Sequence, residues 1–226
     1  MSLPPVFDFH THTLFSDGEL VPAELARRAR MAGYEVLGLA DHADHGCLDH
    51  ILGSVRGSAL ALAGHLGGLT ILPGVEITHV PPPLLADLVK KARDLGASHV
   101  VVHGESPVEP VAPGTNLAAI EAGVDLLAHP GFLSEKEAAR AAEKGVFLEL
   151  SLRGGHGLTN GWVARLARKY GAGLLVSSDG HLVGEYLTPE LQRSTALGAG
   201  LSEEEFAALM DGAARLAETA RRRLSL

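Results

Sequence analysis

The chain has 226 residues and a mass of 23.6 kDa, the size of one large domain, and 46% of its residues are hydrophobic, which is enough for one sizeable core. Its formal charge of -8 and its pI near 5.8 argue against a broad surface for nucleic acid or for anionic membranes. The single cysteine, Cys47, excludes an intramolecular disulfide and suits a reducing compartment. With no leader-like segment and no apolar run of about 18 residues, we expect one cytoplasmic domain over residues 1–226 and no membrane span.

Short apolar runs alternate with amphipathic stretches along the chain, which is typical of parallel strands that are each followed by a covering helix. Seven strands are predicted, at Val6–Phe9, Val36–Ala40, Thr70–Val75, His99–Val102, Leu126–Ala128, Val146–Leu150 and Gly173–Val176. Helices are predicted at Pro22–Ala32, Pro83–Leu95, Leu117–Ala122, Ser134–Lys144, Gly161–Tyr170 and Ser202–Arg223. The pattern predicts an α/β fold, a distorted (β/α)7 barrel close to the (β/α)8 TIM type. The last helix opens on a capping box and should cover the outside or the open end of this barrel.

Histidine and acidic residues follow nearly every predicted strand. The first strand ends in His10 and His12, and their i, i+2 spacing points both imidazoles to one side of an extended backbone. Further candidates follow five later strands: Asp41 with His42, Glu76, His103, His129, and Asp179 with His181. Because the carboxyl ends of barrel strands form the active face, we expect these side chains to converge.

This set of residue types predicts a metal site. Any one motif has an ordinary explanation, such as a polar strand end or a solvated loop charge, but their concurrence at six strand ends does not. Imidazole and carboxylate ligands together suit zinc, manganese or iron. The absence of convergent cysteines excludes a structural zinc site of the cysteine type.

In order and spacing, these residues resemble the PHP (polymerase and histidinol phosphatase) family of phosphoesterases over roughly residues 6–185. The motifs that carry the resemblance are His10-Thr11-His12-Thr13 with Ser16-Asp17-Gly18, Ala40-Asp41-His42, Gly74-Val75-Glu76, His103, Ala128-His129-Pro130 and Ser178-Asp179-Gly180-His181. The resemblance implies a barrel of PHP type that binds two to three divalent metal ions (Zn²⁺, Mn²⁺, or Fe²⁺ or Fe³⁺).

The resemblance also implies how the ligands are shared among the cations. One cation would lie among His10, His12, Glu76 and Asp179, and Glu76 would bridge to a second cation held by His103 and His129. A third would be bound by His42 and His181, with Asp17 at the position where other members have histidine or aspartate.

Such a site hydrolyses phosphate esters through a hydroxide that bridges two cations, because coordination lowers the pKa of water from about 15.7 to about 7. The cations also bind the phosphoryl oxygens and offset the charge that develops during displacement. The resemblance therefore implies a metal-dependent phosphoesterase with Glu76 at its centre. Its expected substrate is a small phosphorylated compound, a phosphomonoester as in histidinol phosphatases.

Two further candidates lie in the loop after the sixth predicted strand. Arg153 has a planar donor fork that matches two phosphoryl oxygens, although it also suits a surface ion pair. His156 lies among glycines and is either a proton donor to the leaving group or an ordinary loop histidine. Other members often have asparagine in this segment. His45 and His79 are expected to line the pocket without binding metal.

Other functions remain open at this stage. A phosphodiesterase or exonuclease acting on short oligonucleotides or nucleotides is one, although an acidic chain with 4% aromatic residues makes extended nucleic-acid binding unlikely. An amidohydrolase would usually have a bridging lysine where this chain has Glu76. A non-catalytic, metal-binding regulatory module would be expected to have degraded ligands, and this set is intact.

Overall fold

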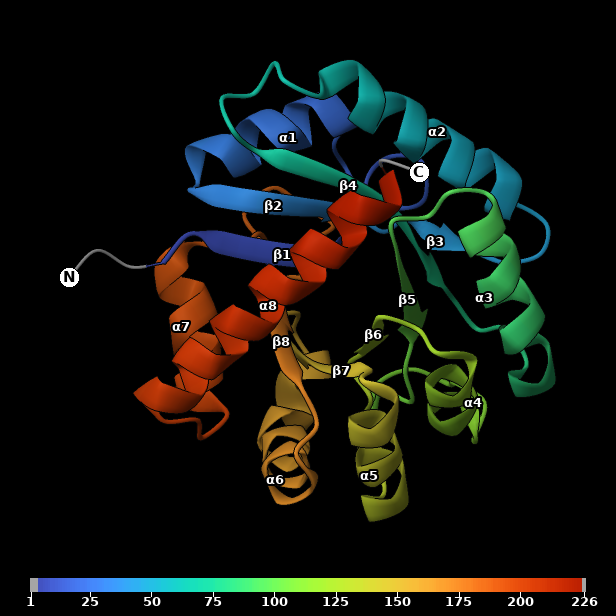
Figure 1. Ribbon diagram of the computed structural model, residues 1–226, viewed down its shortest axis with the longest axis vertical. Coiled ribbons are helices and arrows are strands. Elements are labelled where there is room, and N and C mark those ends of the chain that lie inside the picture. Colours follow the sequence, from blue (N-terminus) through green and yellow to red (C-terminus); the bar gives the residue numbers. More distant parts are fainter. Residues whose placement is uncertain (1–3, 225–226) are drawn as a thin grey trace.

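The computed structural model describes residues 4–224, and in it parallel strands form a barrel surrounded by helices (Figure 1). The strands are β1 (Val6–Thr11), β2 (Tyr34–Leu39), β3 (His42–Ala43), β4 (Thr70–Ile77), β5 (His99–His103), β6 (Leu126–Ala128), β7 (Phe147–Ser151) and β8 (Leu174–Ser177). They pair in the order β1-β2-β4-β5-β6-β7-β8, and the short β3 pairs with β4. Nearly all strand residues are buried because helices cover the outer face of the barrel.

The barrel closes between β1 and β8 at the carboxyl ends of these strands. The backbone N–H of His12 donates to the carbonyl of Gly180 at 3.0 Å, and the N–H of Asp179 donates to the carbonyl of His10 at the same distance. A parallel bridge between Thr11 and Gly180 lies beside them. The expected distorted (β/α)7 barrel is therefore confirmed, and the segments that close it contain predicted metal ligands.

The helices of the described chain follow the strands in turn. They are α1 (Pro22–Met31), α2 (Leu48–Leu62), α3 (Leu85–Asp94), α4 (Thr115–Ala122), α5 (Glu135–Lys144), α6 (Asn160–Tyr170), α7 (Pro189–Gly198) and α8 (Glu203–Leu224), with 3-10 turns at Pro82–Leu84 and His156–Thr159. No helix among residues 4–224 is both long and apolar enough to cross a membrane.

Helix α8 lies across the amino ends of the strands, in front of the barrel in Figure 1. Its Arg221 guanidinium donates to Thr70 Oγ1 at the start of β4 at 2.9 Å, and Arg223 pairs with Asp125 just before β6 at 2.8 Å. The expected capping box is present before it, since the Ser202 N–H donates to Glu205 Oε2 at 2.8 Å and the Glu205 N–H donates to Ser202 Oγ at 3.2 Å. As predicted, this helix covers an open end of the barrel.

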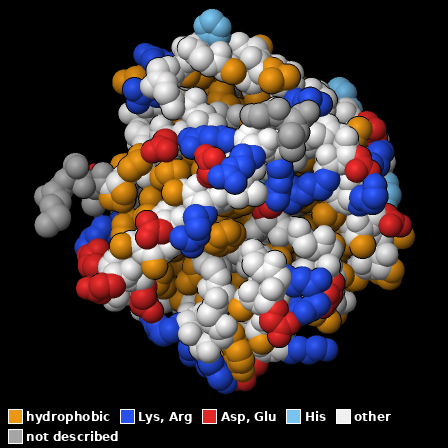
Figure 2. All heavy atoms as spheres, in the orientation of Figure 1, with side chains coloured by type: hydrophobic (Ala, Val, Ile, Leu, Met, Phe, Trp, Pro, Cys, Tyr) orange, Lys and Arg blue, Asp and Glu red, His pale blue; other side chains and the backbone are white. Residues whose placement is uncertain are grey.

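The surface that α8 helps to form has basic and acidic side chains interspersed with apolar atoms, and no area of one charge dominates it (Figure 2). The histidine side chains visible in this view lie at its edges. The amino-terminal end of the barrel is thus a stabilising surface, and the residues that carry chemistry are concentrated elsewhere.

Two helices and one strand were not predicted. Helix α2 contains Gly53 and Gly57, which lower helix propensity and obscure its apolar stripe. Helix α7 has few apolar residues, but it begins at Thr188, whose side chain accepts from the Leu191 N–H at 3.2 Å, and it has proline at its first position. Strand β3 has only two residues, too few for a periodic pattern.

His99, the first residue of a predicted strand, is completely buried among β1, β2, β4 and β5. Its Nε2 lies 2.9 Å from the carbonyl oxygen of Phe9. Gly38 and Gly74 make room for the ring, because a Cβ at either position would overlap it. Burial lowers the pKa of His99 to about 4, so the ring stays neutral inside the barrel.

We expect His99 to make the stability of the metal-free protein depend on pH. The unfolded chain takes up a proton at this side chain below its ordinary pKa of 6.5, whereas the folded chain resists protonation down to about 4. Its contribution is therefore complete above pH 6.5 and lost as the pH falls towards 4, by about 3 kcal/mol over that interval. Urea unfolding of wild type and His99→Gln at several pH values measures the difference, in which other groups cancel. Parallel profiles would contradict it.

Candidate metal centre

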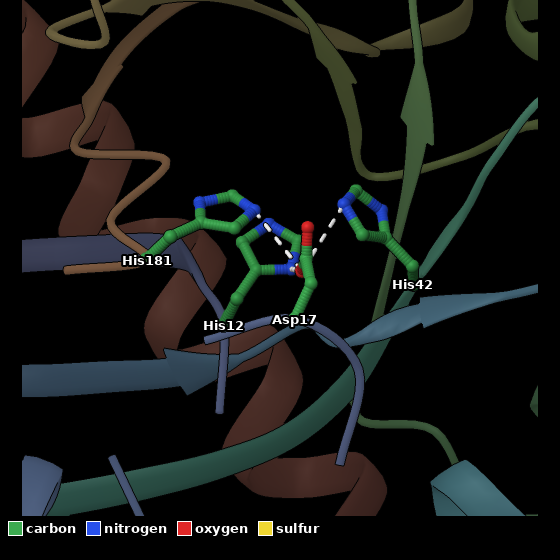
Figure 3. Close-up of side chains that lie close together, drawn as sticks. All are labelled: His12, Asp17, His42 and His181. Atoms are coloured by element: carbon green, nitrogen blue, oxygen red, sulfur yellow. Dashed lines mark ion pairs between the residues drawn. The ribbon is translucent and has the colours of Figure 1, made fainter. Parts of the chain in front are cut away.

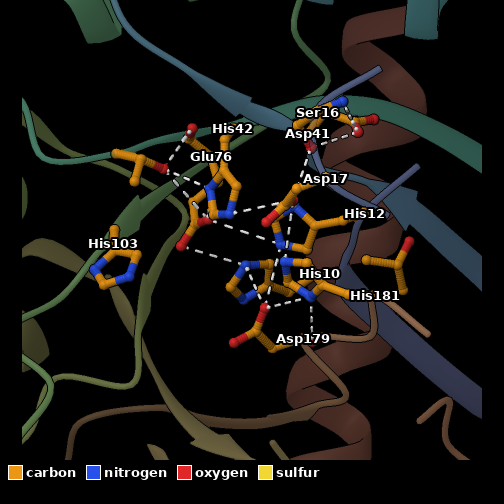
Figure 4. Close-up of polar contacts among 12 residues, drawn as sticks. His10, His12, Ser16, Asp17, Asp41, His42, Glu76, His103, Asp179 and His181 are labelled. Carbon is orange, nitrogen blue, oxygen red and sulfur yellow. Dashed lines mark hydrogen bonds and ion pairs between the residues drawn. The ribbon is translucent and has the colours of Figure 1, made fainter. Parts of the chain in front are cut away.

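All nine predicted ligand residues lie together at the carboxyl end of the barrel, and Figure 4 shows most of them. They come from β1 and its loop, β3, β4, β5, and the loops after β6 and β8. Most are almost completely buried, whereas the side chain of Asp17 is 54% exposed and that of His42 is 27% exposed. The barrel has therefore assembled the site that the strand ends predicted.

The first group consists of His10, His12 and Asp179, with Glu76 beside them. Asp179 Oδ1 lies 3.2 Å from His12 Nε2 and 3.6 Å from His10 Nε2. Glu76 Oε1 lies 3.3 Å from His10 Nε2, and its Oε2 lies 3.7 Å from His12 Nε2. These are the four residues that the PHP resemblance assigned to one cation.

The second group consists of Glu76, His103 and His129, whose ligand atoms lie within 4.8 Å of one another. Glu76 Oε1 is 3.7 Å from His129 Nε2 and also faces His10 of the first group. Glu76 therefore stands between the two groups.

The third group consists of His12, Asp17, His42 and His181 (Figure 3). Asp17 Oδ1 lies 3.2 Å from His181 Nε2 and 3.6 Å from His42 Nε2. His12 was not expected in this group, and it faces Asp17 through Nδ1 at 3.9 Å. His12 thus lies between two groups, as Glu76 does.

Asp41 has a structural role instead. Its carboxylate accepts hydrogen bonds from the Thr13 N–H at 2.8 Å and from the Ser16 hydroxyl at 2.8 Å. These bonds fix the loop after β1, on which Asp17 is exposed towards His42 and His181.

Hydrogen bonding shows that this cluster fits divalent cations. Five buried side-chain atoms in it have no hydrogen-bond partner: His10 Nε2, both ring nitrogens of His12, Glu76 Oε1 and His129 Nδ1. A buried polar group without a partner costs about 1–3 kcal/mol, so a protein does not gather several of them without another stabilising interaction. Divalent cations bound by imidazole and carboxylate would supply it.

The acceptors around the imidazoles fix the direction of their lone pairs. In each of four histidines Nδ1 lies beside an oxygen that can accept its proton, so that Nε2 faces the cluster and can bind a cation. The pairs are His10 with Glu149 Oε1 at 2.9 Å, His42 with Glu76 Oε2 at 2.7 Å, His103 with the Gly104 carbonyl at 3.1 Å, and His181 with the Asp179 carbonyl at 2.9 Å.

In the metal-free cluster, burial lowers the pKa values of His10 and His42, but the facing Glu76 outweighs it and holds both above their usual range, so charged imidazoles offset the carboxylates where cations otherwise would. Burial and the neighbouring imidazoles hold the pKa values of His12 and His129 well below the usual range, so both rings are neutral, as metal ligands must be. Burial raises the pKa of Glu76, but His10 and His42 outweigh it and hold that pKa well below its usual value. Burial holds the pKa of Asp179 well above its usual value.

The structure places Arg153 and His156 at the same cavity. Arg153 donates to the carbonyl of Asp179 at 3.2 Å and contacts the His181 ring. The His156 ring stacks on that of His129 with centroids 4.1 Å apart, and its Nδ1 lies 2.7 Å from Ser106 Oγ. His79 lines the cavity as expected, whereas His45 is exposed and does not.

The sequence prediction missed two carboxylates, Glu149 and Glu109. Glu149 is fully buried on β7, and besides its bond to His10 it accepts the His129 N–H at 2.8 Å. The signal for Glu149 in the sequence was that it is a single acidic residue within the apolar run Phe147–Ser151. Glu109, in the loop after β5, faces His103 and His156 at 2.9 and 3.4 Å, and no sequence pattern marks it.

Comparison with known sequences finds relatives in archaea. No family model matches the chain. An uncharacterized protein from Methanocaldococcus jannaschii, MJ1295, is 44% identical over 200 residues, which cover 88% of this chain and 92% of that protein. Ribonuclease P protein component 3 from Methanosarcina acetivorans is 27% identical over 91% of this chain and 85% of its own length.

Comparison with solved structures identifies the fold. A chain of an archaeal ribonuclease P with mature tRNA superposes with a TM-score of 0.73 at 17% identity, covering 96% of this chain and 93% of that chain. Histidinol phosphate phosphatase from Lactococcus lactis, crystallised with zinc, L-histidinol and phosphate, superposes with a TM-score of 0.61 at 13% identity, covering 86% and 94%. This fold carries the ligand residues in the order that the resemblance requires. The chain belongs to one family with the Methanocaldococcus protein, and its fold is that of the PHP-type phosphatases.

Two solved proteins of this fold are metal-dependent phosphatases. Structures of YwqE from Bacillus subtilis and CpsB from Streptococcus pneumoniae, which are metal-dependent tyrosine phosphatases, superpose with a TM-score of 0.63 at 19% identity, covering 94% of both chains. The fold is thus one that supports metal-dependent hydrolysis. The ribonuclease P relatives, however, stand against the expectation that extended nucleic-acid binding is unlikely, because they are components of an RNA-processing assembly.

We expect Glu149→Gln to weaken cation binding by about 10- to 100-fold, the usual effect of removing a carboxylate that orients a ligating histidine. Glutamine retains the size of Glu149 but not the charge that holds the proton on His10 Nδ1. Isothermal titration of metal-free protein with Mn²⁺ or Zn²⁺ measures the affinity. Exposed Glu121, which pairs with Arg140, provides the control Glu121→Gln. Equal affinities in both variants would show that Glu149 only fills space.

Proposed function

We propose that this PHP protein is a metal-dependent phosphoesterase that hydrolyses a small phosphomonoester. The observation that carries the proposal is the buried convergence of imidazole and carboxylate groups whose lone pairs face one another without hydrogen-bond partners. Divalent cations bound at such a site supply an activated water and offset the charge of the phosphoryl group. The chain's own residues have three tasks: to hold the cations, to orient the phosphate and to protonate the leaving group.

Glu76 and His12 have the central task of holding the cations together. Each lies between two groups of candidate ligands, so each would hold neighbouring cations together. The hydrogen bonds of Glu149 to His10 and to the His129 backbone hold β1 and the loop after β6 in fixed positions relative to each other. The site is therefore preorganised by buried groups, which limits the reorganisation needed during hydrolysis.

Arg153 orients the phosphate in this proposal. Its side chain is 31% exposed at the cavity wall, on the side of Asp179 and His181. A guanidinium there can donate two parallel hydrogen bonds to phosphoryl oxygens, and it is the positive side chain among the residues that line the cavity.

His156 is the proposed proton donor to the leaving-group oxygen. Its Nδ1 is held by Ser106, which leaves Nε2 directed at the cavity between Glu109 and Asp179. A group that protonates an alkoxide must lie within hydrogen-bond reach of it, and this nitrogen lines the space available to the ester.

The size of the cavity favours a small substrate. Its volume is about 160 Å³, and it is lined almost entirely by polar side chains, with neither an aromatic platform for bases nor a row of basic residues. A phosphomonoester inserts its terminal phosphate into such a pocket, whereas an internal diester must also accommodate chain on both sides. We therefore favour a monoester, of the kind that histidinol phosphatases cleave.

We expect the metal-loaded protein to hydrolyse p-nitrophenyl phosphate and histidinol phosphate faster than bis-p-nitrophenyl phosphate. Glu76→Gln should lower kcat/KM by more than about 100-fold, because even indirect partners of metal ligands account for 10- to 100-fold. Steady-state kinetics with quantified metal content check both statements, and Glu121→Gln again serves as the charge-matched control. The proposal fails if the metal-loaded protein cleaves no ester, or if Glu76→Gln is fully active.

A second candidate function is that of an RNA-associated subunit, favoured by the similarity to ribonuclease P component 3 over 91% of the chain. Such a role depends on a surface for RNA and protein rather than on the buried cluster. The chain's charge of -8 provides little attraction for a polyanion.

The two functions are separated by the affinity for RNA. For a small-molecule phosphatase, binding of a precursor tRNA at physiological salt should be no tighter than the non-specific range of about 10⁻⁴ to 10⁻⁶ M. A gel-shift or fluorescence-anisotropy titration of wild type and Glu76→Gln measures this. Nanomolar binding that is equal in the two proteins would instead favour the RNA-associated role.

A further inference from the structure

The loop after β5 places a carboxylate at the mouth of the cavity. Glu109 Oε2 lies 2.9 Å from His103 Nε2 and 3.4 Å from His79 Nε2, and its Oε1 lies 3.4 Å from His156 Nε2. The side chains of Glu109 and His79 are 37% and 40% exposed, so both lie on the solvent side of the buried His103. His79, His103 and Glu109 form a group whose ligand atoms lie within 4.8 Å of one another.

The contact between Glu109 and His103 has the geometry of two ligands of one cation. His103 Nδ1 lies 3.1 Å from the Gly104 carbonyl, so the other ring nitrogen, Nε2, is the one that faces Glu109. Imidazole nitrogen and carboxylate oxygen are ligands that divalent cations share in proteins. A cation held by His103 Nε2 therefore has Glu109 Oε2 within reach on its solvent side.

The backbone at His79 provides an independent indication. Among residues 4–224 the non-glycine residues with positive φ are His79, His129 and Asp179, at 53°, 26° and 51°. Two of these three are predicted metal ligands. A side chain held in the left-handed region costs of order 1–3 kcal/mol and persists where the surrounding structure requires its direction. The backbone of His79 is therefore strained in the same way as the backbones of two predicted ligands, His129 and Asp179.

The loop that carries Glu109 is held at its base. Glu105 Oε1 accepts the N–H groups of Gly114 at 3.0 Å and of Asn116 at 2.9 Å, and the Gly104 N–H donates to the Ala128 carbonyl at 3.0 Å. These bonds tie the loop to α4 and to β6. The two ends of the loop on which Glu109 lies are thus held in place by hydrogen bonds.

We propose that Glu109, assisted by His79, is an additional protein ligand of the cation at His103, and binds that cation from the mouth of the cavity. Glu76 and His129 face His103 from the interior of the barrel, and Glu109 and His79 face it from the solvent side. This inference rests on the proposed function only in that it requires the cluster to bind cations.

The position of Glu109 has a consequence for phosphate. An anion that reaches the cation at His103 from the mouth meets the Glu109 carboxylate at the same place and must displace it. Glu109 therefore stabilises the bound cation and competes with phosphate. Removing its charge should change the two affinities in opposite directions, which loss of a merely structural contact would not do.

The test uses the metal-free full chain titrated with Co²⁺, followed by inorganic phosphate. In Glu109→Gln we expect the Co²⁺ site at His103 to weaken by about 10-fold or more and its visible absorption to change, because a ligand is lost. Phosphate should bind the Co²⁺-saturated variant several-fold more tightly than wild type. His79→Gln should weaken Co²⁺ in the same direction. Exposed Glu143→Gln controls for net charge, and His103→Gln identifies the absorption that belongs to this site.

Unchanged Co²⁺ affinity and absorption in Glu109→Gln would overturn the inference and leave an imidazolium–carboxylate ion pair as the explanation of the contact. That result is distinct from failure of the phosphoesterase proposal. A protein whose Co²⁺ and phosphate affinities respond as described, yet which cleaves no ester, retains the extra ligand and loses the proposed function. A phosphatase whose Co²⁺ site ignores Glu109 retains the function and loses the extra ligand.

Discussion

Lone pairs that face one another inside the barrel are the constraint on which the rest of the structure depends. His10, His12, Glu76 and His129 bury five polar atoms without hydrogen-bond partners, a cost of about 1–3 kcal/mol for each atom. The backbone of the same region closes the barrel, since His10 and His12 pair with Asp179 and Gly180 across β1 and β8. Cations at this site would therefore also join the two strands at which the barrel closes, so that metal binding and barrel stability are coupled.

The opposite end of the barrel shows how that cost is offset. Helix α8 packs across the amino ends of the strands. The neutral ring of His99 fills the interior next to Phe9, and Gly38 and Gly74 leave room for it. The core is filled at this end, and Arg221 and Arg223 anchor α8 to the strands. The stability that this end supplies allows polar side chains and a strained backbone at the carboxyl end. The separation of a stabilising end from a chemical end is a general property of (β/α) barrels, and here it explains why the positive-φ residues His129 and Asp179 are tolerated at the site.

The part of the site that the sequence predicted is the part that strand periodicity determines. His10, His12, Glu76 and His103 each follow or end an apolar run, and parallel strands must bring such residues to one rim. Glu149 was missed because a lone acid inside an apolar run has no partner along the chain, and its partner His10 is 139 residues away. Glu109 was missed because its position depends on hydrogen bonds that shape a loop. Helices α2 and α7 were not predicted, because glycines in α2 and the weak amphipathicity of α7 obscure the helical pattern. The cap at Thr188 was a signal for α7 that the prediction did not use.

The similarity to ribonuclease P component 3 and the intact cluster favour different kinds of function. A subunit that only binds RNA and proteins has no need of buried, unpaired imidazoles and carboxylates, and losing them would stabilise it. The nine candidate ligand residues, their Nδ1 partners and the supporting Glu149 thus favour cation binding, whatever assembly the chain joins. Cations held this way act on phosphate oxygens, which small phosphomonoesters and RNA both present. The cavity of about 160 Å³ is the reason that we propose a small monoester, because it has room for a terminal phosphate and little for a chain that continues on both sides.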